Sequence, residues 1–285
     1  MEVQIQSLTV RLLSKALGME ISGVDLRDDL SDDVFAQILN AWHEGLIILL
    51  RNQDLDEEQQ WQFGLRFGPL AGGHIRELES THEGVLYVSN VRKDGKLIGI
   101  LPDGEMQFHS DQCYREQPSQ GSMLHAIEIP TVGGNTLFAN CYAAYETLPE
   151  DIKQRLHGKS ALNAYDYNLN PTQRGTAIAP EVPTWVHPVV RVHPATGRKA
   201  LFVNRLMSVG IEGMPQAESD ELLNFLFDHV EQKQFIYEHV WQRGDVLMWD
   251  NRCTLHARTD FDPNQRRVLR RITLKGEPVL GEAVA

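Results

Sequence analysis

Residues 235–251, FIYEHVWQRGDVLMWDN, indicate the fold class of the chain. They predict two β-strands joined by a turn around residues 243–245, because β-branched and aromatic residues flank a charged, glycine-containing centre. More short strands are expected in GVLYVSNV (84–91), GSMLHAIEI (121–129), GNTLFAN (134–140), HPVVRVHP (187–194), KALFVN (199–204) and RRVLRRITLKG (266–276). So many strands predict a mainly β protein with flanking helices (α+β), built as a sandwich or barrel.

Helices are expected mainly near the start of the chain and in residues 219–232. SDDVFAQILNAWHEG (31–45) has an apolar stripe, and Ser31 can cap its first turn. DEEQQWQFGLRFG (56–68) reads as a second helix that stops near Gly68. LIILLRNQ (46–53), between these two, reads as a buried strand.

The composition limits the classes of partner. The 285 residues are 42% hydrophobic, so we expect one domain over residues 1–285. A formal charge of −12 argues against nucleic acid and against an anionic membrane surface. No apolar run approaches the roughly 20 residues of a membrane helix.

The cysteines and the start of the chain bear on its compartment. Cys113, Cys141 and Cys253 fit no disulfide framework and no CxxC pattern, and the first residues lack the regions of a signal peptide. We therefore expect a cytoplasmic protein. Residues 164–186 are polar and contain three prolines, which predicts either a lid over a site or a surface loop without a role in chemistry.

GEMQFHSDQCY (104–114) places His109 and Asp111 two residues apart in a predicted strand. Side chains at this spacing share a face, and a carboxylate on an apolar face needs a partner. A metal ion is one explanation, and a salt-bridged or solvent-facing strand is the other. His256, just after the strand in GDVLMWDNRCTLHAR (244–258), provides a second imidazole.

Two histidines and one carboxylate suit Fe(II) enzymes, because three coordination positions stay open for a bidentate cosubstrate and O₂. A catalytic zinc site could use the same three ligands, although the protease signature HExxH is absent. Arg267 and Arg271 would share one face of a strand and would require an anion beside the metal. A dicarboxylic oxo acid provides such an anion. The alternative is a basic edge strand exposed to solvent.

Several longer motifs occur in one order: GMEISGVDL, RFGPL, FHSD, GGNTLFAN, HPVVRVHPATGRKALFVN, WDNRCTLHA and RRVLRRITLKGE. With these motifs the chain resembles the taurine / 2,4-dichlorophenoxyacetate dioxygenase (TauD/TfdA) family, nearly from end to end. The resemblance implies a double-stranded β-helix, that is, a cupin-like jelly roll. It also implies an oxygenase that depends on Fe(II) and 2-oxoglutarate and consumes O₂.

The resemblance also implies roles for individual residues. His109, Asp111 and His256 would be the catalytic iron ligands. Thr136 would hydrogen-bond a 2-oxoglutarate carboxylate, and Arg267 would bind the distal carboxylate of this cosubstrate. Arg271 would lie near an anionic group of the substrate or near the inner carboxylate. Asp250 and Asn251 are interpreted as structural residues that order the turn before His256.

The substrate pocket is expected to depart from that of taurine oxygenases. Glu105 stands where those enzymes carry an asparagine, and an acidic side chain would repel a sulfonate or pair with an amine or hydroxyl. Further candidates for substrate contact are His74, Asn90, Tyr167 and Met207.

The predicted activity is hydroxylation of a small anionic molecule, with release of succinate and CO₂. Hydroxylation next to a heteroatom would cleave a C–O, C–S or C–N bond. The alternatives are a cupin-like metal-binding protein without turnover and a zinc-dependent hydrolase. The expected partner is a small-molecule substrate rather than nucleic acid or a membrane. We also expect a homo-oligomer, a dimer or tetramer.

Overall fold

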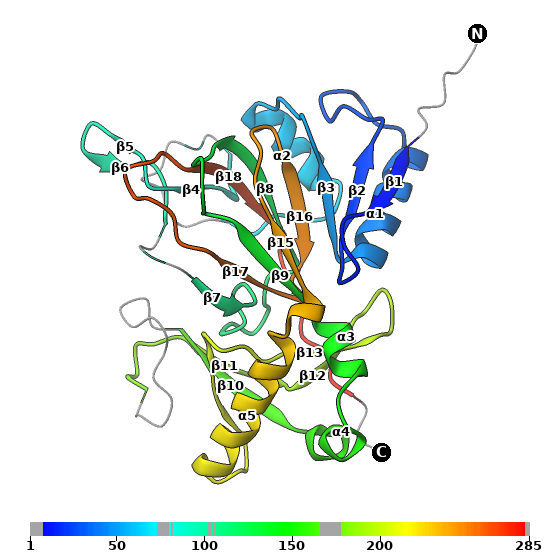
Figure 1. The fold of residues 1–285 in the computed structure, drawn as a ribbon, viewed down its shortest axis with the longest axis vertical. Helices are drawn as coiled ribbons and strands as arrows, with labels where there is room; N and C mark the ends of the chain where they lie inside the picture. Colours follow the sequence, from blue (N-terminus) through cyan, green and yellow to red (C-terminus); the bar gives the residue numbers. More distant parts are fainter. Residues whose placement is uncertain are drawn as a thin grey trace.

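A computed structural model describes residues 8–72, 80, 82–101, 104, 106–165 and 178–282. Its larger sheet has seven strands in the order β1-β2-β3-β16-β8-β18-β4. In that order the strands are Thr9–Leu12, Met19–Ser22, Ile47–Leu50, Val246–Asp250, Gly121–Glu128, Val268–Thr273 and Val85–Ser89. All pairs are antiparallel except β2 with β3. Figure 1 shows this sheet in the upper half of the molecule.

A smaller sheet has four strands in the order β15-β9-β17-β7. These strands are Ile236–His239, Thr136–Asn140, Thr254–Arg258 and Met106–His109. One apolar cluster joins the two sheets, because Leu247 and Trp249 from β16 pack in it with Phe138 and Leu255 from the smaller sheet. The rings of Phe138 and Trp249 have centroids 5.5 Å apart. Together the two layers form a jelly roll, as the family resemblance implied.

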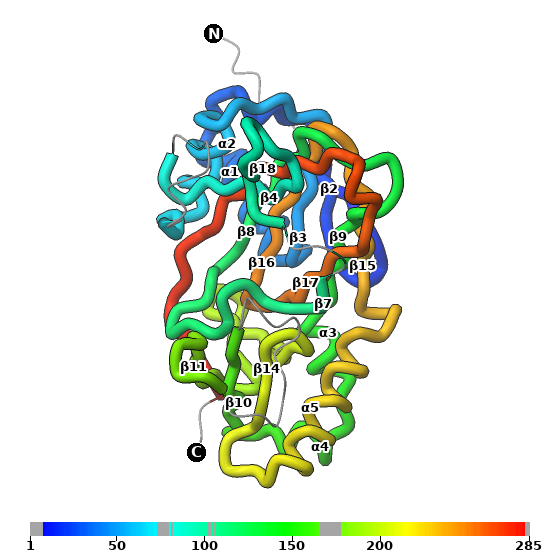
Figure 2. Tube along the Cα trace, turned by 90° about the vertical axis from the view of Figure 1, so that its left-hand side faces the viewer, coloured from blue at the N-terminus to red at the C-terminus, as the bar shows by residue number. Residues whose placement is uncertain are grey.

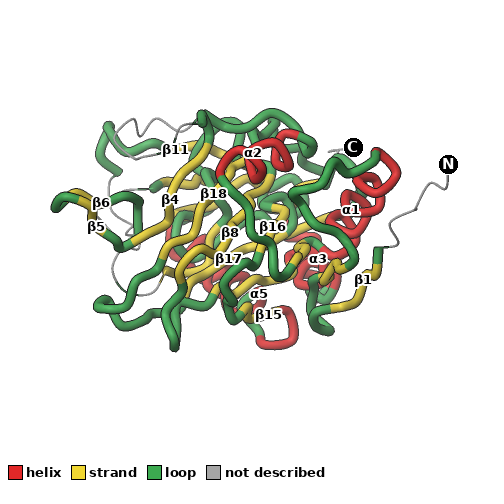
Figure 3. The backbone as a smooth tube through the Cα atoms, turned by 90° about the horizontal axis from the view of Figure 1, so that it is seen from above, coloured by secondary structure: helices red, strands yellow, loops and turns green. Residues whose placement is uncertain are grey.

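Helices α1 (Asp32–Gly45) and α2 (Glu57–Leu65) cover the outer face of the larger sheet, as Figure 3 shows from above. Successive side chains along these strands therefore point alternately to the helices and to the inner core. Val246 and Met248 pack outward against the helices, whereas Leu247 faces the inner core. β3 is buried along its whole length, since its two faces meet the two clusters. The oxygen of the predicted cap, Ser31 Oγ, accepts a hydrogen bond from the Val34 N–H.

The opposite end of the molecule holds most of the remaining elements, as the lower half of Figure 1 and the bottom of Figure 2 show. They are a sheet of β10 (Ser160–Ala164), β11 (Thr184–Pro188) and β14 (Ser208–Ile211), a pair of β12 (Val190–Val192) and β13 (Lys199–Leu201), and helices α3 (Cys141–Glu146), α4 (Glu150–Leu156) and α5 (Gln216–Val230). The short pair β5 (Arg92–Lys93) and β6 (Lys96–Leu97) and the 3₁₀ turn η1 (Lys233–Phe235) complete the assignments. None of the described helices is both long and apolar enough to cross a membrane.

Three expectations need correction or a limit. The strands predicted around residues 243–245 exist, but β15 and β16 enter different sheets rather than pairing with each other. β18, which carries the arginines, lies between β8 and β4, so the edge-strand alternative is wrong. The predicted lid, 164–186, begins at the last residue of β10 and ends inside β11, and its residues 166–177 lie outside the described part.

Candidate active site

His109 and His256 are brought together by two neighbouring strands of the smaller sheet. His109 ends β7 and His256 lies in β17, where the backbone register pairs the two residues directly. Their ring centroids are 4.1 Å apart. His109 Nδ1 lies 2.8 Å from the carbonyl oxygen of Gln107. A carbonyl only accepts, so Nδ1 carries the proton and Nε2 keeps a free lone pair.

Asp111 completes the cluster from a turn rather than from the strand. β7 ends at His109, and the next residues form a turn in which Gln112 has a φ of 59°. The expectation that His109 and Asp111 share a strand face is therefore wrong, and the turn brings them together instead. Asp111 Oδ1 lies 3.9 Å from His109 Nε2 and 3.7 Å from His256 Nε2.

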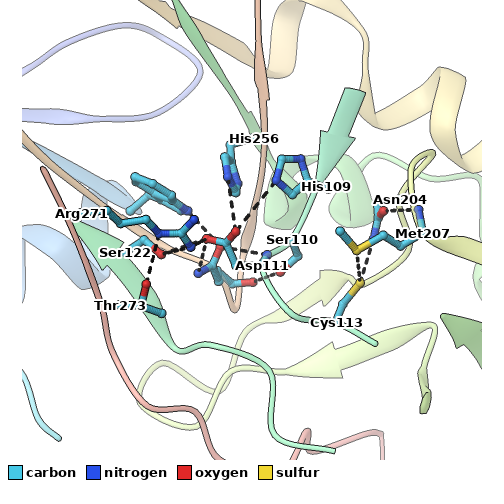
Figure 4. A network of polar contacts seen from close by, with 12 residues as sticks. His109, Ser110, Asp111, Cys113, Ser122, Asn204, Met207, His256, Arg271 and Thr273 are labelled. Atoms are coloured by element: carbon cyan, nitrogen blue, oxygen red, sulfur yellow. Dashed lines mark hydrogen bonds and ion pairs between the residues drawn. The ribbon is translucent and has the colours of Figure 1, made fainter. Parts of the chain in front are cut away.

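The other carboxylate oxygen, Asp111 Oδ2, is held by a set of donors that Figure 4 shows from close by. Arg271 Nη2 lies 2.6 Å away, Ser122 Oγ donates at 2.8 Å, and Asn251 Nδ2 donates at 3.4 Å. Arg271 also donates to the hydroxyls of Ser122 and Thr273. One oxygen of the carboxylate is thus fixed by the protein, while the other faces both imidazoles.

Burial and charge set the protonation states of these groups. Burial would raise the pKa of Asp111, but the positive charges of Arg271 and the histidines outweigh it and hold this pKa well below the usual range. Burial also lowers the pKa of His109 and of His256. At neutral pH the cluster therefore offers one carboxylate and two neutral imidazoles, which are the forms that bind metals.

These residues fit a divalent iron ion. Their ligand atoms all lie within 4.8 Å of one another, and the set of two histidines and one carboxylate is the one that non-haem Fe(II) oxygenases use. His256 Nδ1 is buried and has no hydrogen-bond partner in the described part of the chain. The three side chains would bind the metal from one side and leave the cavity side open.

A second group of potential ligands, His193, Asp250 and Cys253, is already satisfied within the protein. Arg252 holds both oxygens of Asp250 at 2.8 and 2.6 Å, and His193 Nε2 lies 3.0 Å from Oδ2. The other nitrogen, His193 Nδ1, accepts from two backbone N–H groups. Burial raises the pKa of the Cys253 thiol well above its usual value. The cluster anchors the turn that carries Asn251 to the end of β16.

The His–Asp–His cluster opens into a cavity of about 400 Å³. Cationic side chains reach its wall from β17, β18 and the segment before β18, namely Arg258, Arg271 and Arg267. Much of the remaining wall is apolar, with Leu86, Val88, Ile100, Leu101, Met106, Leu206 and Met207. The cavity therefore combines the His–Asp–His cluster at one end with cationic side chains and an apolar surface.

Arg267 is only 2% exposed, although it carries a charge. Its Nε and Nη2 donate to the Gly134 carbonyl at 3.3 and 3.2 Å, while Nη1 has no partner among the described residues. Burial and the nearby charge of Arg258 lower the pKa of Arg267 to about 9. Thr136 also lines the cavity, and its hydroxyl oxygen accepts from Trp241 Nε1 at 3.0 Å.

Comparison with known proteins agrees with this geometry. The model of the "Taurine catabolism dioxygenase TauD, TfdA family" matches residues 9–273. The chain belongs to the TauD/TfdA family. It is 35% identical over 278 residues to the alpha-ketoglutarate-dependent 2,4-dichlorophenoxyacetate dioxygenase of Cupriavidus pinatubonensis, covering 91% of this chain and 95% of the relative. It is also 35% identical over 291 residues to the (S)-phenoxypropionate/alpha-ketoglutarate-dioxygenase of Sphingobium herbicidovorans, covering 96% of each.

The fold comparison gives the same result. A crystal structure of a taurine dioxygenase from Burkholderia xenovorans matches with a TM-score of 0.82 and 31% identity, over 97% of this chain and 93% of that one. The TauD/TfdA-family chain is therefore a 2-oxoglutarate-dependent dioxygenase that uses Fe(II) and O₂, as predicted. The alternatives of a metal-binding protein without turnover and of a zinc hydrolase do not agree with these matches.

The structure of this TauD/TfdA-family enzyme collects most of the predicted site residues in one place. His109, Asp111, His256, Thr136, Arg267, Arg271 and Met207 all line the cavity. Met207 is fixed there by its sulfur, which lies 3.4 Å from Cys113 Sγ. Asn90 does not line the cavity. Its amide instead binds the backbone around Arg267: Nδ2 donates to the Pro263 and Gln265 carbonyls, and Oδ1 accepts from the Arg267 N–H. His74, Glu105 and Tyr167 lie outside the described residues.

Two residues of the site were not predicted from the sequence. Ser122 lies on the same face of β8 as Leu124 and Ala126, which belong to the inner core. Alternation along this strand would have indicated a hydroxyl in that core. Arg258 follows His256 by two residues on β17, so the same rule places it on the metal-binding face.

Proposed function

We propose that this enzyme hydroxylates a small organic anion with an apolar body. The observation that carries the proposal is the cavity itself, in which Arg271 lies beside the metal-binding carboxylate and apolar side chains cover much of the remaining wall. The two relatives named above are called dioxygenases of 2,4-dichlorophenoxyacetate and of (S)-phenoxypropionate, and both compounds are anions with an apolar ring. A substrate of this kind fits the charge and the polarity of the wall.

We assign the roles of the site residues as follows. His109, Asp111 and His256 would hold the iron, Arg267 and Thr136 would hold 2-oxoglutarate at its distal carboxylate, and Arg271 would bind the anionic group of the substrate. When bound, iron supplies, together with 2-oxoglutarate and O₂, the oxidation that hydroxylates a C–H bond and releases succinate and CO₂. If the hydroxylated carbon bears a heteroatom, the product collapses with cleavage of the C–O, C–S or C–N bond.

Arg271 is suited to orient a substrate anion. Its Nε donates to Thr273, and its Nη2 contacts Asp111 and Ser122. The structure gives Nη1 no partner among the described residues, so this group remains available to an anion in the cavity. Because Asp111 fixes the guanidinium, a bound anion would hold the substrate at a set position relative to the metal ligands. Met207 and the other apolar residues of the cavity would then exclude water from the apolar part of the substrate.

Asn90 would act indirectly, because its amide holds the backbone of the segment that carries Arg267. Contacts of the substrate with His74, Glu105 and Tyr167 remain predictions from the sequence.

The experiment that tests this function measures succinate formed from 2-oxoglutarate by the purified protein. We expect formation to depend on Fe(II) and on an added prime substrate. A panel would include aryloxy acids, alkyl sulfates, sulfonates and amino-acid derivatives, with a neutral aryl ether as the matched control. Aryloxy acids should stimulate succinate formation most and the neutral ether least. Equal stimulation by neutral and anionic compounds would remove the role assigned to Arg271.

We further propose a single-domain, cytoplasmic homo-oligomer. The site draws on both sheets, because His256 lies in the smaller sheet and Arg271, which contacts Asp111, lies in the larger one; this supports one domain. Cys113, Cys141 and Cys253 are free and buried, which supports a reducing compartment. β1 forms one edge of the larger sheet and exposes Leu12 (73%), which supports self-association. Light scattering after size-exclusion chromatography would determine the number of subunits.

A further inference from the structure

Part of the cavity wall belongs to a small apolar cluster, distinct from the two clusters that pack against the larger sheet. The small cluster consists of Cys113, Tyr114, Phe202, Leu206 and Met207. Tyr114, Leu206 and Met207 line the cavity, whereas Cys113 and Phe202 do not. The cluster therefore has one face toward the cavity and a back that other side chains cover.

Two polar contacts hold Met207 in this cluster, as Figure 4 shows. Cys113 Sγ lies 3.4 Å from Met207 Sδ and accepts a hydrogen bond from Asn204 Nδ2 at 3.4 Å. Asn204 Oδ1 accepts from the Met207 N–H at 2.9 Å. Cys113 follows Asp111 by two residues. The position of Met207 is therefore linked to the turn that carries the carboxylate proposed to bind iron.

Val279 covers the back of the small cluster. It packs against the cluster but does not line the cavity. The side chain of Val279 is partly buried, whereas that of the next residue, Leu280, is 52% exposed. Val279 follows the part of the chain, residues 9–273, that the family model matches. It is thus a residue outside the matched region that supports the cavity wall from behind.

The chain is held in place on both sides of Val279. Before it, Gly276 lies so close to the Pro118 carbonyl that a side chain would not fit there. After it, Glu282 forms an ion pair with Lys199 Nζ at 2.6 Å, and the Glu282 side chain is only 8% exposed. Val279 is therefore pressed against the cluster by a backbone that is fixed at two points.

We propose that Val279 is a positioning residue for substrate selectivity. It sets how far Leu206 and Met207 protrude into the cavity, and thereby how large the apolar part of the substrate can be. The proposal rests on the function proposed above, in which an anion with an apolar body occupies this cavity. Protein interiors are closely packed, so a shorter side chain at position 279 leaves a gap into which the neighbouring side chains partly withdraw.

Selectivity between two aryloxy acids tests this role. The kcat/KM is measured for phenoxyacetate and for 4-tert-butylphenoxyacetate, and the ratio of the two values is compared between wild type and variants. Val279→Ala should shift the ratio about 10-fold toward the larger acid, the lower end of the range for one methylene group in an apolar pocket. The KM for 2-oxoglutarate should not change, because Thr136 and Arg267 do not belong to the cluster.

Two further variants distinguish positioning from a general effect on the fold. Val279→Ile keeps a β-branched apolar side chain and should retain the wild-type ratio. Leu280→Ala is the matched control, because it shortens an exposed side chain and keeps the backbone contact in which the Leu280 carbonyl accepts from the Val192 N–H at 2.7 Å. An unchanged ratio in Val279→Ala, or an equal change in Leu280→Ala, would overturn the proposal.

The environment of Met207 gives a second measurement, which does not depend on the substrate. The chain has seven methionines, and NMR with isotope-labelled methionine methyl groups observes them in the metal-free protein. Met207→Leu identifies the Met207 signal, which should move in Val279→Ala and stay in place in Leu280→Ala. If the wild type turned over neither aryloxy acid, the proposed function would fail, while this signal would still test the packing. A Met207 signal that did not move in Val279→Ala would overturn the proposal in either case.

Discussion

Arg271 Nη2 lies 2.6 Å from Asp111 Oδ2, so the arginine proposed to meet the substrate also holds the carboxylate proposed to bind iron. Ser122 links the two, since its hydroxyl donates to Asp111 and accepts from Arg271. The proposed metal site and the proposed substrate site are therefore connected through one carboxylate oxygen, Asp111 Oδ2. Variants of these three residues should have effects that differ in kind.

Asp111→Ala should abolish hydroxylation and weaken Fe(II) binding at least 100-fold, because it removes the anionic ligand and leaves two neutral imidazoles. Anaerobic calorimetry with Fe(II) measures the affinity. Asp28→Ala, at an exposed position, is the control and should bind iron normally. Unchanged metal affinity in Asp111→Ala would refute the ligand assignment.

Ser122→Ala should reduce metal affinity about 10- to 100-fold, the range for residues that orient a ligand. Asp111 Oδ2 loses one donor, while the contacts from Arg271 and Asn251 remain. The control is Ser119→Ala, because the buried hydroxyl of Ser119 has no partner among the described residues. An equal effect of both substitutions would show that Ser122 does not position Asp111.

Arg267→Lys should raise the KM for 2-oxoglutarate about 10- to 150-fold, because lysine keeps the charge but loses the bidentate fork. The KM for the prime substrate should change little. Steady-state kinetics with each compound varied in turn separates the two effects. A rise confined to the prime substrate would place Arg267 in the substrate site instead.

Arg271→Ala should raise the KM for an anionic substrate while 2-oxoglutarate is still consumed without product. Ser122 and Asn251 continue to hold Asp111, so iron affinity should fall less than in Asp111→Ala. The ratio of succinate to hydroxylated product measures the uncoupling. If this variant weakened only 2-oxoglutarate, Arg271 would belong to the cosubstrate site and the expectation of an anionic substrate would fail.

Asp250→Asn should lower the free energy of unfolding by about 3–5 kcal/mol at pH 7, because Arg252 remains buried without its counter-charge. Burial alone would raise the pKa of Asp250, but Arg252 and His193 hold it well below its usual range. A lowered pKa stabilises the fold above the unfolded value of about 3.9, and this stabilisation is lost as the pH falls. Urea unfolding of the metal-free proteins should therefore show the difference between wild type and variant shrinking below pH 4. A constant difference would contradict the ion-pair explanation.

The strand and helix patterns in the sequence were sufficient to predict the layers of the fold. Alternation places Leu247 inward and Met248 outward, and the apolar stripe with its Ser31 cap predicts α1. The pairing of strands was not predictable in the same way. β15 and β16 are consecutive, yet they join different sheets, and local periodicity contains no information about which distant strand each will meet.

The residues of the candidate site were likewise predictable only in part. His109, Asp111, His256, Thr136, Arg267 and Arg271 were found from motif order, and the cavity collects all of them. The prediction that His109 and Asp111 share a strand face failed because the chain turns after His109. Gln112 has a φ of 59° in this turn, and no residue type in the segment indicates a turn. Ser122 and Arg258 contact residues far away in the chain, since Ser122 donates to Asp111 and Arg258 donates to the Gly104 carbonyl. Their places in the site therefore follow from strand register rather than from the residues next to them.

The position of β7 affects how firmly the metal-free protein holds His109 and Asp111. In the described sheet β7 is the outermost strand, whereas β17 lies between β7 and β9. His256 therefore lies in a strand that is paired on both sides, whereas β7, which carries His109, is paired with a described strand on one side. Iron bound to His109 and His256 would link β7 to β17 through side chains, in addition to the backbone pairing of these two strands. Amide hydrogens of residues 106–111 should then exchange faster in the metal-free enzyme, and a protease should cut there first.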